Sequence, residues 1–237
     1  MSKADMIDDF PLSDPRSFGL HAAKLGVGLG DIAFPGFGYL LQLGVDKLAG
    51  DPLQERRVRW LVSVGEGLRE LQGRFEGFDP SALNENEEFL SAVYDATEAS
   101  MKTHKEFKRE ALKNTVLNAA VNFTIDDALR GRFMSCIDHF TEKHVRILNV
   151  LHDPSRFPAC ADMASRMMGA QMHIIRAEIP DSEIDETVFS IIIDDLSRER
   201  MIEGSLNTMV SGSSLLAKRS TPVGDAFLRF IRAPEPI

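Results

Sequence analysis

The spacing of apolar residues predicts helices over most of the chain. After Pro52, apolar residues recur at intervals of three and four, which places them on one face of a long helix. These residues are Leu61, Val64, Leu68, Leu71 and Phe75. The stripe can pack into a helical bundle, and it can equally pair with its own copy in a homodimer.

A second helical stretch covers residues 86–121 and predicts one long helix or two in series. Its inward stripe is expected at Phe89, Val93, Ala96 and Ser100. Residues 126–140 keep another set of apolar positions on one side, namely Leu129, Phe133, Ile137 and Phe140. Residues 161–179 return to helix, and no strand is expected before residue 205.

Short polar residues mark where several helices should begin. Asp14-Pro15 and Asp51-Pro52 each place a capping carboxylate before a proline at the first helical position. Thr124 and Thr141 open segments that resemble capping boxes, and Thr221-Pro222 precedes the last helix.

The C-terminal segment combines helix and strand signals. Residues 185–204 predict a helix that ends at Gly204. Its inward positions are Val188, Phe189, Ile192 and Leu196. The β-prone residues 206–210 and 215–216 flank a Ser-Gly-Ser-Ser tetrapeptide, which is typical of a hairpin. A short apolar helix over 223–231 follows.

These elements predict a mainly α fold, a multi-helix bundle with a C-terminal winged-helix-like element that contains a small β-hairpin. Three segments are expected. Residues 1–50 hold a glycine-rich apolar hairpin, residues 51–180 form the helical bundle, and residues 181–237 form the winged-helix-like element. The boundary before the last segment falls at Pro180-Asp181.

The composition limits the class of protein and its compartment. The chain has 237 residues, of which 43% are hydrophobic and 27% charged, as in globular proteins. A net charge of −9 argues against a nucleic-acid partner. Cys136 and Cys160 have no ligand or disulfide spacing. The acidic N-terminus lacks the pattern of a signal peptide. No apolar run approaches the roughly 20 residues that a membrane-spanning helix needs. We expect a cytoplasmic protein, with peripheral membrane contact as an alternative.

The stretch LGVGLGDIAFPGFGYLLQLGVDKL, residues 25–48, is rich in glycine and otherwise mostly apolar. Its marked positions are Gly26, Gly28, Gly30, Pro35, Gly36 and Gly38. A phosphate-binding loop would need a buried strand before the glycines, whereas helix signals precede them here. Two alternatives stay open: a tight apolar helical hairpin packed on the bundle, and a segment that meets a membrane or a partner.

Histidines and carboxylates gather near one predicted helix junction. They are Asp138, His139, Glu142, His144, His152 and Asp153. A zinc site needs ligands at i,i+3 or i,i+4 on one helix face, whereas His139 and His144 are separated by about 140° around a helix. No metal and no cofactor are predicted.

No sequence motif marks a nucleophile. The chain has no GxSxG elbow, and neither cysteine has an activating neighbour pattern. A Ser-His-Asp set could still assemble from distant segments, because triads are defined by geometry and not by chain order. We expect a protein that is not an enzyme, and the alternative is an enzyme whose catalytic site is assembled from distant residues.

Positive charge gathers at two places in this acidic chain. One predicted helix carries Lys102, Lys105, Lys108, Arg109 and Lys113, and a second cluster is formed by Arg56, Arg57 and Arg59. Such patches can hold an anionic surface, RNA or an acidic partner, although the interspersed Glu106 and Glu110 also fit a solvated helix face. On the predicted wing, Lys218 and Arg219 could contact DNA, but residues 181–237 carry more acidic than basic residues, so phosphate repulsion opposes this.

Three stretches carry a family resemblance. They are EEFLSAVYDATEASMKTHKEFKREALKN, FMSCIDHFTEKHVRILNVLHDP, and VFSIIIDDLSRERMI together with STPVGDAFLRFI, and they span residues 86–231. In these stretches the chain resembles the abortive-infection alpha family, helical bacterial proteins associated with phage defence. The resemblance implies a bacterial, defence-linked setting, and it implies no catalytic residue.

The leading hypothesis is a non-enzymatic bacterial protein that acts through protein–protein contacts, in phage defence or a stress response. Its contact surface is expected on the basic helix around Lys102–Lys113. One alternative is a membrane-active effector that uses residues 25–48. Another is a DNA-binding winged-helix regulator that uses Lys218 and Arg219.

Overall fold

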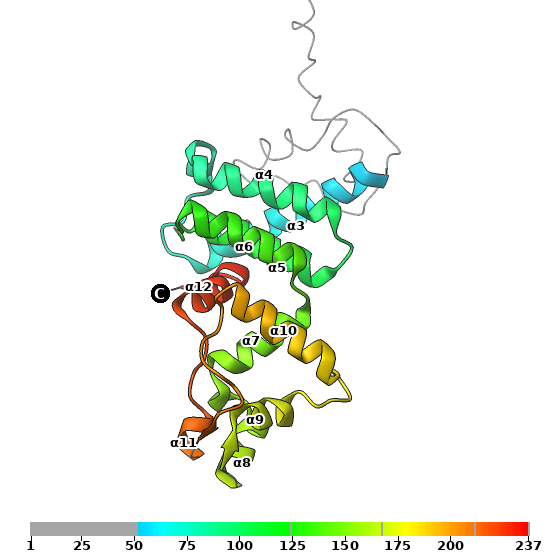
Figure 1. The fold of residues 1–237 in the computed structure, drawn as a ribbon. Helices are drawn as coiled ribbons and strands as arrows, with labels where there is room; N and C mark the ends of the chain where they lie inside the picture. Colours follow the sequence, from blue (N-terminus) through cyan, green and yellow to red (C-terminus); the bar gives the residue numbers. More distant parts are fainter. Residues whose placement is uncertain (1–51, 124, 167, 211, 237) are drawn as a thin grey trace, which may run out of the picture. The chain divides into compact units, whose positions relative to one another are not determined.

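The computed structural model describes residues 52–236, apart from residues 124, 167 and 211. The described part is mainly helical (Figure 1), which confirms the predicted fold class. The predicted hairpin at residues 25–48 and the predicted caps at Asp14, Asp51 and Thr124 lie outside the described residues.

The described chain divides into two compact units. Unit 1 holds residues 52–104, 115–123 and 234–236, and unit 2 holds residues 105–114 and 125–233. The helix α5, Glu106–Ala120, therefore contributes its first part to unit 2 and its last part to unit 1. Pro180 and Asp181 both lie inside unit 2, so the predicted boundary there would separate segments of one unit.

Unit 1 is built around α3, Pro52–Arg74, and α4, Glu87–Lys102, which pack on each other (Figure 1). A 3-10 helix, η2, Pro80–Glu85, connects them. The predicted stripes are confirmed, because both helices bury the expected apolar positions. On α3 these are Leu61, Val64, Leu68 and Leu71, and on α4 they are Phe89, Val93, Ala96 and Ser100. Phe75 lies just beyond α3 and is half-buried.

The stretch over residues 86–121 forms two helices in series. Asn86 caps α4, and its side chain accepts a hydrogen bond from the Phe89 backbone nitrogen at 2.9 Å. Thr103 has an extended backbone, with φ −115° and ψ 141°, so the helix ends at Lys102 and α5 begins at Glu106. The basic residues predicted on one helix are therefore divided between α4, the connection and α5.

Unit 2 contains most of the remaining elements. In chain order they are α6 Asp127–His139, α7 Glu142–His152, η3 Pro154–Arg156, α8 Pro158–Arg166, β1 Gly169–Ala170, α9 Gln171–Glu178, α10 Glu186–Arg198, β2 Met209–Val210, α11 Gly212–Leu215 and α12 Pro222–Ile231. The helices α10 and α12 both pack on α7, and α9 and α11 pack on α8 (Figure 1).

Aromatic side chains from three segments form the centre of the unit 2 core. Phe133 of α6 lies 5.3 Å from Phe227 and 5.5 Å from Phe230 of α12, measured between ring centroids. Phe140 meets Phe227 edge-to-face at 5.7 Å. The predicted inward face of residues 126–140 is thereby confirmed at Phe133 and Phe140, and offset or edge-to-face rings of this kind add specificity to the burial.

The predicted β-hairpin between residues 206–210 and 215–216 is wrong. Met209–Val210 instead pairs antiparallel with Gly169–Ala170, and Leu215 ends the short helix α11. The strand β1, Gly169–Ala170, interrupts the helix predicted over residues 161–179. The expectation of no strand before residue 205 is therefore also wrong. A β-prone segment shows only that it needs a partner, and the partner is set by tertiary packing. The winged-helix-like assignment stays a prediction.

Helix ends follow local capping chemistry with two differences from expectation. Thr221 caps α12, as predicted, and accepts from the Gly224 nitrogen at 3.1 Å. The start of α6 is capped by Asp126, whose side chain accepts from the Ala128 nitrogen. At the other end, α10 stops at Arg198, before the predicted end at Gly204, and both Arg200 and Gly204 have a positive φ, of 55° and 80°.

Candidate functional site

A pocket of about 400 Å³ opens along one side of α7 in unit 2. From α7 it is lined by Glu142, Val145, Arg146, Asn149 and His152. These positions are three or four residues apart or adjacent, so they share one face of the helix. The pocket is completed by Phe107 of α5 and by Asp153, Arg156, Phe157 and Arg232.

The arginines of the pocket are held differently. Arg146 forms an ion pair with Glu183 and donates to the Glu178 carbonyl at 3.2 Å. Arg232 donates to Asn149 Oδ1. The guanidinium of Arg156 is exposed and makes no hydrogen bond or ion pair with the described residues. Arg156 therefore gives this pocket a guanidinium that no described residue engages.

The structure brings His152 of α7 together with two residues near the start of α12. His152 Nδ1 lies 2.7 Å from Asp225 Oδ1 and 3.0 Å from Ser220 Oγ, and Ser220 Oγ donates to Asp225 Oδ1 at 2.6 Å. Burial raises the pKa of Asp225, but hydrogen bonds from Lys218, Ser220 and His152 outweigh it and leave the pKa below its ordinary value of 3.8. Asp225 is therefore the ionised centre of this cluster.

This Ser-His-Asp cluster does not have the geometry of a catalytic triad. A triad places serine at one imidazole nitrogen and the carboxylate at the other. Here both partners contact Nδ1, and Ser220 is only 6% exposed. Sequence reasoning left such an assembly open and named His152, but it missed Ser220 and Asp225. They lie 68 and 73 positions away from His152, and no local pattern connects them.

Of the other predicted histidines and carboxylates, Glu142 and Asp153 line the α7 pocket, whereas His139 and His144 do not. His144 is buried, stacks on Phe140 and lies 3.3 Å from Asp195 Oδ2. His139 is exposed, and its Nδ1 contacts the Ser135 carbonyl. Within residues 52–236, as far as they are described, no three His, Cys, Asp or Glu side chains are arranged to hold a metal ion.

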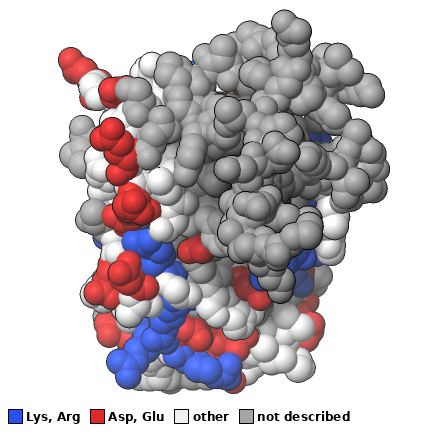
Figure 2. Space-filling view, turned by 90° about the horizontal axis from the view of Figure 1, so that it is seen from above, with Lys and Arg blue, Asp and Glu red and all other residues white. Residues whose placement is uncertain are grey.

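The predicted basic residues are partly engaged by neighbours. Arg109 pairs with Glu106 at 2.7 Å, Lys113 pairs with Glu110 at 2.8 Å, and Lys108 Nζ donates to the Asp138 carbonyl. In the second cluster, Arg57 pairs with Glu98 and Arg56 donates to the Ser100 carbonyl. Figure 2 shows Lys and Arg side chains lying beside Asp and Glu side chains on the described part of the face that it views.

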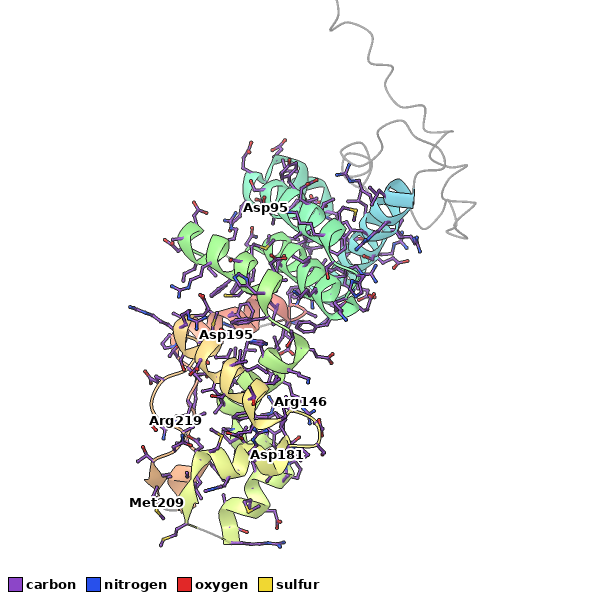
Figure 3. All side chains as sticks on the ribbon, turned by 45° about the vertical axis from the view of Figure 1, so that its right-hand side comes forward. Asp95, Arg146, Asp181, Asp195, Met209 and Arg219 are labelled. Atoms are coloured by element: carbon purple, nitrogen blue, oxygen red, sulfur yellow. The ribbon has the colours of Figure 1, made fainter. Side chains whose placement is uncertain are left out.

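The two predicted wing cations also have partners within unit 2. Lys218 forms an ion pair with Asp225, and Arg219 Nε donates to Gln171 Oε1 at 2.6 Å. In the view of Figure 3, Arg219 and Met209 lie on the left side of unit 2, whereas Arg146 of the pocket lies on the right. Arg219 and Arg146 therefore lie on different sides of this unit in that view.

Both cysteines are buried thiols. Burial, with Glu199 nearby, raises the pKa of Cys136 to about 12, and burial, with Glu178 nearby, raises the pKa of Cys160 to about 11. Because the thiolate is the reactive form, neither side chain is an activated nucleophile in the folded protein.

A second pocket, of about 330 Å³, lies in unit 1 beside the turn after α3. Its lining includes Phe75, Phe78, Leu83 and the acidic pair Glu76 and Asp79. Its lining among the described residues includes no Lys, Arg or His, so it offers fewer specific contacts to an anionic ligand than the α7 pocket.

Comparison with known proteins leaves the function to be argued from the geometry. No protein-family model, no curated protein and no solved structure matches this chain. Among the described helices, none combines the length and the apolar character that crossing a membrane requires. The resemblance to the abortive-infection alpha family stays a prediction.

Proposed function

We propose that this protein acts through contacts with a protein partner, and that the basic segment of unit 2 forms the contact surface. The basic segment consists of Lys105, Lys108, Arg109 and Lys113, at the start of α5. Its partner would present acidic side chains. A bacterial, phage-defence setting is consistent with the family resemblance described above.

The observation that supports this proposal is the arrangement of charge on α5. Arg109 and Lys113 lie four residues apart on one face of α5, with Lys108 beside them, and Lys105 precedes Arg109 by four residues in the connection just before the helix. Because a basic surface steers acidic partners towards it, this surface suits recognition of an acidic protein.

The local ion pairs of the segment do not block such a contact. The acidic partners Glu106 and Glu110 have side chains that are 80% and 52% exposed. Exposed pairs of this kind contribute about 0–1 kcal/mol, so carboxylates of a partner can replace them at little cost. Lys102 belongs to unit 1 and is left out of this surface.

The proposal is tested by reversing the charge of the segment. The variant Lys105→Glu/Lys108→Glu/Arg109→Glu should lose partner capture in a quantitative pull-down from a bacterial host, followed by binding of the purified partner. A control with the same change in net charge is Lys143→Glu/Arg166→Glu/Arg198→Glu, at exposed positions outside the segment. Circular dichroism should show equal helicity for all three proteins. Equal capture by both variants would remove the basic segment from consideration.

The two other hypotheses have less support. The membrane-active effector depends on residues 25–48, outside the described residues, and stays a prediction. For the DNA-binding regulator, Lys218 and Arg219 are engaged within unit 2, and α10 exposes the acidic side chains of Glu186 and Asp194. Phosphate contact there would have to overcome this negative charge.

A further inference from the structure

We propose that the α7 pocket binds a small organic oxyanion, a phosphate monoester or a carboxylate that carries an apolar group. The proposal does not rest on the protein contact described above, because the basic segment does not line the pocket. Only Phe107 of α5 does.

The cationic end of the pocket lies just beyond the last turn of α7. The guanidinium of Arg156 is exposed and has no partner among the described residues, so its fork of N–H groups is available to two oxygens of one anion. Arg232 reaches the same region through its bond to Asn149 Oδ1. That bond occupies the amide oxygen and leaves the Nδ2 hydrogens of Asn149 as donors for a ligand.

His152 adds a further contact at this end. Its Nδ1 is taken by Asp225 and Ser220, so Nε2 is the nitrogen that remains, and it donates to an oxyanion when both ring nitrogens carry a proton. A carboxylate at Nδ1 fixes the orientation of the imidazole ring. In this cluster, Asp225 and Ser220 therefore position the imidazole ring of His152, which lines the pocket.

The remaining lining fits the organic part of the ligand. Phe107, Val145 and Phe157 give the pocket apolar walls from three different segments. Its volume of about 400 Å³ lies within the range of small-molecule sites, which combine apolar walls with a few placed polar groups.

The acidic residues of the pocket are placed so that they leave this end positive. Glu142 lies ten residues before His152 on α7, about 15 Å away along the helix axis. Arg146, between them, is already paired with Glu183. Asp153 accepts a hydrogen bond from Ser155, and Arg156 and Arg232 together outweigh its single charge.

Titration of the full-length, isotope-labelled protein with phenyl phosphate, benzoate and benzylamine tests this proposal by NMR. We expect saturable shifts with one or both anions, with a Kd of about 1 mM for these small probes, and none with the cation benzylamine. The tighter of the two anions distinguishes a phosphate site from a carboxylate site. Arg156→Gln should weaken binding by about tenfold, the loss of one charge-assisted contact.

Arg166→Gln provides the matched control, because Arg166 is an exposed arginine on α8 that does not line the pocket. The Kd of the Arg166→Gln variant for each anion should equal that of the unchanged protein. The proposal is overturned if neither anion gives saturable shifts, or if Arg156→Gln and Arg166→Gln bind equally well. A failure here would leave partner capture by the basic segment unaffected, so the two proposals fail separately.

Discussion

His144 is the third residue of α7 and forms a capping box with Thr141 at the start of this helix. Its imidazole takes the place that glutamate or glutamine usually holds in a capping box. The Thr141 backbone nitrogen donates to His144 Nδ1 at 3.2 Å, and the ring stacks on Phe140 with centroids 4.7 Å apart. His144 Nε2 lies 3.3 Å from Asp195 Oδ2. This arrangement requires a neutral imidazole that accepts at Nδ1 and donates at Nε2.

We predict that the free energy of unfolding decreases as the pH falls below 6.5. Burial lowers the pKa of His144 below its ordinary value of 6.5, against the opposing influence of Asp195. The unfolded chain therefore binds the proton more readily than the folded one. The contribution is fully present above pH 6.5 and is lost as the pH falls through the lowered pKa. Urea denaturation at about pH 7.5 and about pH 5.5 measures the difference.

His144→Gln is the matched control for this pH effect. A glutamine side chain can still accept the Thr141 N–H in a capping box, but it does not titrate. Its unfolding free energy should change less between the two pH values than that of the unchanged protein. An identical change in both proteins would assign the pH dependence to other groups.

At the scale of elements, the start of α12 is packed against the turn after α10. A Cβ atom added at Gly224 would lie 2.2 Å from the Met201 carbonyl oxygen. That oxygen also accepts from the Thr221 nitrogen at 3.0 Å, so it is fixed by the backbone. The glycine is needed here for close approach of two backbone segments and not for a special φ.

We expect Gly224→Ala to destabilise the protein by about 1–3 kcal/mol or more, because the backbone must shift to admit the methyl group. Gly73→Ala is the matched control in α3, where an added Cβ meets nothing within 4 Å. It should instead stabilise by about 0.5–1 kcal/mol, since alanine loses less conformational freedom in a helix. Urea denaturation compares the two variants, and similar midpoints would contradict the close approach at α12.

At the scale of the whole molecule, the chain carries separate natural probes of its two units. The single tryptophan, Trp60, lies in unit 1, where Nε1 donates to Thr97 Oγ1 at 3.0 Å. Both cysteines lie in unit 2 and are buried. Tryptophan fluorescence therefore reports on unit 1, and thiol labelling reports on unit 2.

We predict that the two probes show one coincident unfolding transition in urea. The helix α5 has 15 residues and is divided between the units, so unfolding of one unit removes part of a helix that the other needs. Isolated helices shorter than about 12–15 residues are marginal in water, so the remaining part should not persist. Separate midpoints for fluorescence and labelling would show instead that the units unfold independently.

The amino-acid sequence by itself determined the helices, because their signals are local. The spacing of Leu61, Val64, Leu68 and Leu71 is set within a few turns of one helix, and so is the capping of α7 by Thr141 and of α12 by Thr221. Periodicity was less reliable where a helix ends without a strong stop signal. The break at Thr103 and the strand at Gly169–Ala170 were therefore left open or missed.

Only the tertiary structure decided which distant segments meet. It paired Met209–Val210 with Gly169–Ala170, and it brought Asp225 to His152 across 73 positions of the chain. The α7 pocket likewise needs residues from α5, α7 and the segment after α12 at one place. Such contacts depend on how helices pack in three dimensions, and the local pattern of apolar and polar residues does not specify which helix packs on which.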